Sequence, residues 1–179
     1  MPNNAMRKAT CFLIDRPSGV IEEVSIISDQ VLDITRKIKP SHGSNFTGRF
    51  PIRYEQEGRT ESIPYESGLE RKFLEWIQNT GAVKKVSAQP FKVTGYIRGI
   101  RREYTPDFRI DLFVVPHDLV GRGFGATTIV EVKPASQAFD RDVLLKLCLL
   151  RLATDLPVAL ITEQTMSMPL QRLEANHVH

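Results

Sequence analysis

The sequence contains few cysteines, few aromatic residues and no long apolar run. Its 179 residues include two cysteines, so we expect two free thiols in a reducing compartment rather than a disulfide framework. Its four histidines are scattered without metal-ligand spacing, which argues against a zinc site. The longest apolar stretches, at 112–116 and 144–150, fall far short of the roughly 18–20 residues that cross a membrane.

The chain also lacks a secretory signal and a large excess of charge. Asp15, Arg16 and Pro17 break the apolar stretch near the N-terminus that a signal peptide would need. We therefore expect a cytoplasmic protein without a membrane segment. Hydrophobic residues make up 41% and charged residues 25%, as in ordinary globular proteins, and the net charge of +3 permits a polyanionic partner.

Length and local composition predict one domain with short extensions. We expect an N-terminal arm or small hairpin at 1–40, a main domain at 41–165 and a polar C-terminal tail at 166–179. A turn signal at 16–19 separates the two short apolar segments that would form the hairpin.

The pattern of apolar residues predicts an α/β fold. Apolar residues recur at helical spacing over 66–80, where Ser67 is the expected N-cap. Segments rich in β-branched and aromatic residues predict strands. In order, we expect strands at 10–14 and 20–27, a loop at 41–50, a helix at 66–80, strands at 83–86, 91–97, 104–115 and 127–133, a helix at 139–153 and a strand at 157–162. This succession is typical of a mixed central β-sheet flanked by helices.

Two short strings contain the residues that could do chemistry. Pro106-Asp107 lies near the start of one expected strand, and Glu131-Val132-Lys133 lies at the end of the next. Adjacent strands would bring Asp107 and Glu131 side by side. The two-residue period puts Lys133 on the face of Glu131 and turns Val132 toward the core. Two converging carboxylates suit Mg²⁺ or Mn²⁺, which activates water, and a lysine can orient that water beside a phosphate.

A third carboxylate could come from the first helix. Glu70 is the candidate, and Glu66, one turn earlier, is its competitor. The plainer interpretation of Glu70 is a carboxylate favoured by the helix dipole, and that of Lys133 is a solvated lysine at the end of a strand. Lys146 and Gln137 could face a phosphate, although a solvated helix face is the favoured interpretation for both.

Together, Glu70, Pro106-Asp107 and Glu131-Val132-Lys133 resemble the PD-(D/E)xK nuclease superfamily. More narrowly, the chain resembles the TnsA-like endonuclease subunits of heteromeric transposases from about residue 40 to residue 162. The strings that carry this narrower resemblance are those at 46–51, 65–74, 89–91, 104–108 and 130–134.

The resemblance implies a restriction-endonuclease-like core and a Mg²⁺- or Mn²⁺-dependent DNA endonuclease that cuts the 5′ ends of a transposon. It implies Glu70, Asp107 and Glu131 as metal ligands. The carbonyl of Val132 is a further ligand, and Lys133 is the catalytic lysine. The implied partners are double-stranded DNA at the transposon ends, a transposase that cuts the 3′ ends and a regulatory ATPase. Only about 17 residues follow the last expected strand, so contact with an ATPase would fall to the tail or to residues 1–40.

Two other functions remain open on sequence alone. A stand-alone nuclease of a restriction or repair system would cut duplex DNA with metal and no partner protein. A non-catalytic DNA-binding or assembly subunit would keep the nuclease fold without the chemistry. The complete set of carboxylates and lysine argues against the second, because an inactive copy has no chemical need for all of them.

Overall fold

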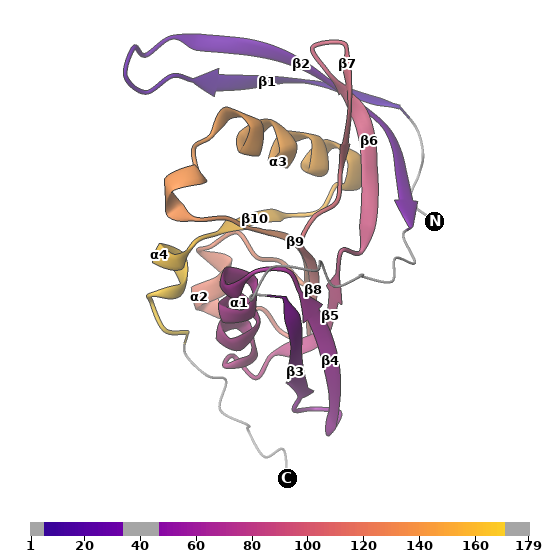
Figure 1. Cartoon of the computed structure of the whole chain (residues 1–179), viewed down its shortest axis with the longest axis vertical. Helices are drawn as coiled ribbons and strands as arrows, with labels where there is room; N and C mark the ends of the chain where they lie inside the picture. The colour runs from indigo at the N-terminus through magenta and orange to yellow at the C-terminus, as the bar shows by residue number, and fades with distance from the viewer. Residues whose placement is uncertain (1–5, 34–46, 171–179) are drawn as a thin grey trace.

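The computed structural model describes residues 6–33 and 47–170 of the chain (Figure 1). The strands are β1 (Arg7–Ile14), β2 (Ile21–Asp33), β3 (Gly48–Tyr54), β4 (Arg59–Tyr65), β5 (Val83–Ala88), β6 (Phe91–Ile97), β7 (Ile100–Tyr104), β8 (Phe108–Leu112), β9 (Thr127–Val132) and β10 (Val158–Ile161). The helices are α1 (Gly68–Gln78), α2 (His117–Val120), the 3₁₀ helix η1 (Ala135–Gln137), α3 (Arg141–Thr154) and α4 (Glu163–Met166). In this part of the chain, no helix is long and apolar enough to cross a membrane.

The strands form three sheets. The central sheet has the order β10-β9-β8-β5, in which β10 and β9 run parallel and the other neighbours run antiparallel. The expected α/β architecture with a mixed sheet is therefore confirmed. A second, antiparallel sheet has the order β1-β2-β6-β7, and β3 pairs with β4 in a separate hairpin. The sequence pattern did not predict this division, because periodicity identifies strands without saying which of them pair.

Helix α3 lies between the second sheet and the central sheet (Figure 1). It contacts β1, β2 and β6 on one side and β10 on the other. A helix covered on two sides must be apolar on more than one face. Its buried residues are Leu145, Leu147, Leu149, Leu150 and Ala153.

The central sheet separates two apolar cores. Successive residues of β9 point to opposite faces, so Ile129 packs in the core that contains α3, whereas Val130 and Val132 pack in the core that contains α1. Ser67 begins α1 as predicted: its hydroxyl oxygen accepts a hydrogen bond from the backbone N–H of Glu70 at 3.1 Å.

The predicted bounds of two segments, the strand at 104–115 and the loop at 41–50, were wrong. The expected strand at 104–115 is divided, because β7 ends at Tyr104 in the second sheet and β8 begins at Phe108 in the central sheet. The chain crosses between the sheets around Pro106, which has no N–H for a strand ladder. The expected loop at 41–50 is wrong from Gly48 onward, where β3 begins, and residues 41–46 lie outside the described part of the chain.

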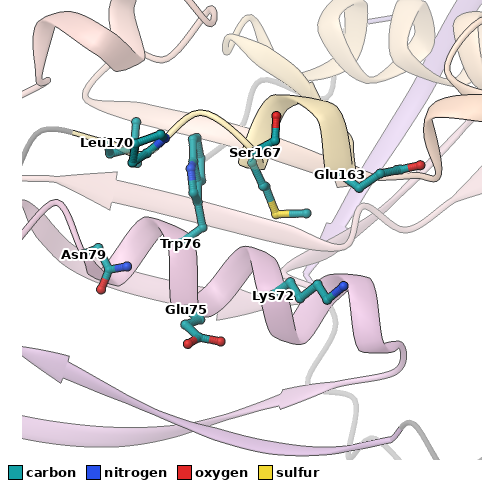
Figure 2. A pocket seen from close by; sticks show the side chains of 9 residues that line it. Lys72, Glu75, Trp76, Asn79, Glu163, Ser167 and Leu170 are labelled. Carbon is teal, nitrogen blue, oxygen red and sulfur yellow. The ribbon is translucent and has the colours of Figure 1, made fainter.

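The residues after β10 pack on α1 (Figure 2). The indole N–H of Trp76 donates to the carbonyl of Met168 at 3.1 Å, and Met166 and Leu170 pack against the α1 core. A pocket of about 400 Å³ between α1 and this segment is lined by Lys72, Glu75, Trp76, Asn79, Glu163, Met166, Ser167, Pro169 and Leu170. The first residues of the expected tail, as far as 170, therefore contact the domain.

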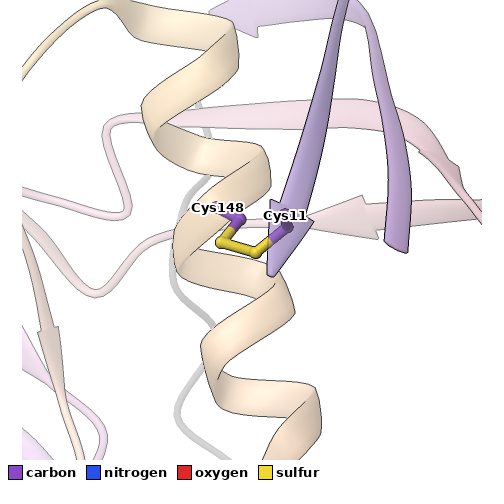
Figure 3. Close-up of a disulfide and its surroundings, with 2 residues drawn as sticks. All are labelled: Cys11 and Cys148. Atoms are coloured by element: carbon purple, nitrogen blue, oxygen red, sulfur yellow. A yellow bond between two sulfur atoms is a disulfide. The ribbon is translucent and has the colours of Figure 1, made fainter. Parts of the chain in front are cut away.

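The expectation of two free thiols was wrong, because Cys11 of β1 and Cys148 of α3 form a disulfide (Figure 3). The two residues are separated by 137 positions in the sequence, with Cα atoms 6.7 Å apart. Cys148 lies on the side of α3 that faces the second sheet. Spacing in the sequence could not pair it with Cys11, because only the packing of β1 on α3 brings them together.

We predict that replacing Gly95 with alanine loosens the contact between the second sheet and α3. A Cβ at Gly95 would collide with the backbone oxygen of Ile27 and with the side chain of Leu149. We expect Gly95→Ala to lower the free energy of unfolding by about 1–3 kcal/mol, as overpacking does. Urea denaturation followed by the fluorescence of the single tryptophan measures this change.

Gly121 provides a matched control. It has a φ of −62°, and its missing Cβ would face open space. We expect Gly121→Ala to stay within about 0.5 kcal/mol of the parent protein, as surface substitutions usually do. Equal stabilities for the two variants would contradict the close packing at Gly95.

Candidate functional site

Strands β8 and β9 place Asp107 beside Glu131. The antiparallel ladder pairs Phe108 with Val130, so the continued register puts Asp107, one residue before β8, opposite Glu131. Phe108 and Val130 both face the α1 core, so the alternating residues Asp107 and Glu131 lie on the α3 side of the central sheet. The two carboxylates come together as the two strings predicted.

Lys133 lies between these two carboxylates. Its Nζ is 2.9 Å from Glu131 Oε1 and 3.6 Å from Asp107 Oδ2. The two-residue period of a strand put Lys133 on the face of Glu131, as expected. An ammonium group therefore already occupies the position between the carboxylates where a cation is most strongly attracted.

The carboxylate of Glu131 is completely buried, with 0% of the side chain exposed. Its Oε1 accepts hydrogen bonds from Lys133 and from Lys146 of α3. Its Oε2 is buried and has no hydrogen-bond partner. A buried, unpaired carboxylate oxygen is costly, and such an atom in a folded protein often marks a place for an ion or a ligand.

The backbone of Val132 faces Asp107. The N–H of Val132 donates to Asp107 Oδ2 at 2.8 Å, whereas the N–H of Lys133 donates toward β10, to Ile161, at 3.0 Å. By this alternation, the carbonyl of Val132 also points toward the β8 side. The continued register places Pro106 opposite Val132, and a proline has no N–H to donate to that carbonyl. The Val132 carbonyl is thus directed to the Asp107 side without a ladder bond from Pro106.

Glu70 is near the site, but its carboxylate is held at the start of α1. Its charge acts on Asp107 and Lys133. Its Oε2 accepts from the backbone N–H of Glu66 at 2.8 Å, and its Oε1 accepts from the hydroxyl of Ser67 at 3.1 Å. Burial raises the pKa of Glu70, against the lowering effect of these hydrogen bonds. Glu66, the competitor for this role, is exposed.

Burial and like charge control the ionisation of the site. Burial raises the pKa of Asp107 to about 7, and the negative charges of Glu131 and Glu70 act in the same direction. Burial alone would lower the pKa of Lys133, but the neighbouring carboxylates outweigh it and the net effect is a raised pKa. The Lys133 side chain is therefore a protonated donor.

The donor set fits one hard divalent cation held by few protein ligands. Within residues 6–33 and 47–170, no group of three or more His, Cys, Asp or Glu side chains is arranged to hold a metal ion. Asp107 and Glu131, with the Val132 carbonyl, nevertheless supply hard oxygen donors, and Mg²⁺ commonly takes only one or two carboxylates and keeps several waters. A cation in the site would give the unpaired Glu131 Oε2 a partner, and its positive charge would lower the raised pKa of Asp107.

Lys146 is the residue of the candidate site that the sequence interpretation missed. A solvated helix face was the favoured interpretation, but only 15% of its side chain is exposed, and its Nζ donates to Glu131 Oε1. Its ammonium lies 5.4 Å from the centre of the Tyr104 ring. The sequence did contain a signal for its burial, because the residues before and after Lys146 in α3 are apolar. Gln137 is exposed in η1, outside α3.

Comparison with known proteins does not place the chain in a family. No protein-family model matches the sequence, and no curated protein matches it. The function must therefore be inferred from the site itself.

We predict that the metal-free protein loses stability as the pH rises from about 4 to about 7. The folded state raises the pKa of Asp107 from 3.8 to about 7, so it holds that proton more tightly than the unfolded chain does over this range. The stabilisation is complete below pH 4 and is lost as the pH rises through 7.

The Asp107→Asn variant isolates this effect, because the amide oxygen can still accept from the N–H of Val132 and no longer titrates. Its free energy of unfolding in EDTA should fall less over the same pH range. Urea denaturation at a series of pH values measures both proteins. Parallel pH profiles would show that Asp107 has an ordinary pKa.

Proposed function

We propose that this protein is a divalent-metal-dependent DNA endonuclease that acts as a subunit of a transposase. The observation that carries the proposal is the contact of Asp107, Glu131 and Lys133 where β8 and β9 meet. Two carboxylates and a lysine on adjacent strands are suited to metal-assisted hydrolysis of a phosphodiester. The resemblance of the strings at 65–74, 104–108 and 130–134 to TnsA-like endonucleases supports the narrower assignment.

Asp107, Glu131 and the Val132 carbonyl would hold Mg²⁺ or Mn²⁺, with Glu70 beside them. The bound cation supplies an activated water and positive charge for the phosphate. Without it, the ammonium groups of Lys133 and Lys146 are already paired with the carboxylates of Asp107 and Glu131, so little positive charge remains to attract DNA. This charge balance is the reason to expect strict metal dependence.

Lys133 would orient the attacking water and stabilise the phosphate by donating hydrogen bonds. Its pKa is raised by the carboxylates, so its ammonium has three N–H donors and no lone pair. It therefore stabilises charge on the phosphate and does not accept the proton of water. Water oxygen would bond to phosphorus as the bond to the 3′ oxygen breaks. The water would release a proton to solvent and the 3′ oxygen would take one up, which leaves a 5′-phosphate and a 3′-hydroxyl.

Strand β7 offers a path for the DNA backbone toward the site. Tyr104 ends β7 three residues before Asp107, and Arg102 is exposed on the face of β7 that it shares with Tyr104. The charge of Arg102 acts on the Tyr104 hydroxyl. Arginines in such a position contact phosphates without reading bases, and their contacts weaken with salt.

Selection of the cleavage position would come from a partner transposase bound at the transposon ends. Helix α3 is covered by sheets on two sides, so it cannot enter a DNA groove as a recognition helix does. We therefore expect weak or no cutting by the isolated protein. A regulatory ATPase is the further partner implied by the resemblance, and cytoplasmic location agrees with all of these partners.

We predict that cleavage of a supercoiled plasmid bearing the element ends needs Mg²⁺ or Mn²⁺ together with the neighbouring transposase. Asp107→Asn and Lys133→Met should each reduce cleavage at least about a hundredfold, because each removes a group that contacts the reacting centre. Gel assays of plasmid nicking and linearisation in Mg²⁺, Mn²⁺ and EDTA measure this.

Two exposed residues outside the site supply matched controls. Glu75→Gln on α1 and Lys85→Met on β5 make the same kinds of charge change and should leave cleavage unchanged. Metal-dependent cutting without the transposase would identify a stand-alone nuclease. Intact DNA or partner binding with no cutting under any condition would identify an assembly subunit and contradict the enzyme assignment.

A further inference from the structure

We propose that Lys146 is a positioning residue for Glu131, and that its ammonium takes the place of a second divalent cation, so that the site works with one metal ion. This inference rests on the proposed endonuclease function and extends it to the number of metal ions. It concerns a residue of α3 that lies outside the strings Pro106-Asp107 and Glu131-Val132-Lys133.

Lys146 is held against Glu131 of the candidate site. Its side chain is 15% exposed, its Nζ donates to Glu131 Oε1, and the Tyr104 ring lies beside it at 5.4 Å. The neighbouring positions Leu145 and Leu147 are buried in α3, so the helix presents Lys146 from a fixed backbone. A buried lysine without a partner would be costly, and Glu131 is that partner.

The two lysines determine which oxygen of Glu131 stays free. Both Lys133 and Lys146 bind Oε1, and Oε2 is buried with no partner. One oxygen of the carboxylate is thus fixed by ammonium groups while the other remains for a cation. Without Lys146 on the α3 side, only Lys133 would hold Oε1, so the carboxylate could turn about its last bond and offer either oxygen to a metal ion.

The charges of the site favour a single cation. With a metal ion bound and the carboxylates of Glu70, Asp107 and Glu131 ionised, three negative charges stand against the two positive charges of Lys133 and Lys146. One divalent cation would turn the surplus negative charge into a single positive charge, which one phosphodiester neutralises. A second divalent cation would leave a strong excess of positive charge within a largely buried cluster, where charge is poorly screened.

The test compares Mn²⁺ binding with cleavage for the full-length protein and the variants Lys146→Met and Lys146→Arg. Calorimetry and electron paramagnetic resonance of free Mn²⁺ give the number of ions bound per chain, and plasmid cleavage with the transposase gives activity. Lys72→Met, an exposed lysine of α1, is the matched control for loss of a helix lysine.

We expect one Mn²⁺ per chain for the parent protein, the control and Lys146→Arg, and two for Lys146→Met. Cleavage at limiting Mn²⁺ should fall about tenfold or more in Lys146→Met and recover as Mn²⁺ rises, whereas Lys146→Arg should stay within about threefold of the parent. A purely structural role would lower stability and Mn²⁺ binding together and would not add an ion.

Three results would overturn the proposal. Two Mn²⁺ ions in the parent protein would show that Lys146 does not replace a cation, even if Lys146→Met fails to fold. A folded Lys146→Met protein that binds one ion, or that cleaves like the parent, would show the same. A parent protein whose Mn²⁺ binding is absent or survives Asp107→Asn would instead reject the proposed metal-dependent function, and the role of Lys146 with it.

Discussion

The buried carboxylate of Glu131 is the constraint on which the site depends. With 0% of the side chain exposed, it has lost its hydration and must be compensated from within the protein. Lys133 compensates it from the same strand, and Lys146 compensates it from α3. The Glu131 carboxylate lies where β8 and β9 meet, and the second carboxylate, that of Asp107, lies beside it.

Three features of the fold meet at this carboxylate. The chain leaves the second sheet after Tyr104 and enters the central sheet at Phe108, which places Asp107 in the crossing just before β8. Helix α3 lies between the sheets (Figure 1). It brings Lys146 to Glu131 and to the Tyr104 ring. Pro106 lies opposite Val132 in the continued register and has no N–H for the Val132 carbonyl, which points to the Asp107 side. The crossing of the chain between two sheets therefore shapes the site.

Local patterns predicted the parts of the site that belong to one strand or one helix. The two-residue period placed Lys133 with Glu131 and turned Val132 into the core, and the capping pattern placed Ser67 and Glu70 at the start of α1. Patterns failed to predict the surroundings of a residue that contacts an element distant in the sequence. Lys146 resembled a solvated lysine because its partner Glu131 lies on β9, and Cys11 and Cys148 resembled free thiols because only the packing of β1 on α3 brings them together.

The sequence by itself determined the order of most strands and helices, the mixed α/β class and the identities of the paired carboxylates and their lysine. These follow from side-chain periodicity and from short-range spacing, which act within one element or between neighbours. Only the tertiary structure decided that the strands divide into three sheets and that α3 lies between two of them. It also decided that the oxygens of Glu131 are unequal, one bound by two lysines and one unpaired. Those properties arise from contacts between segments that are distant in the sequence. Burial strengthens the charge interactions at Glu131, and a linear pattern does not contain burial.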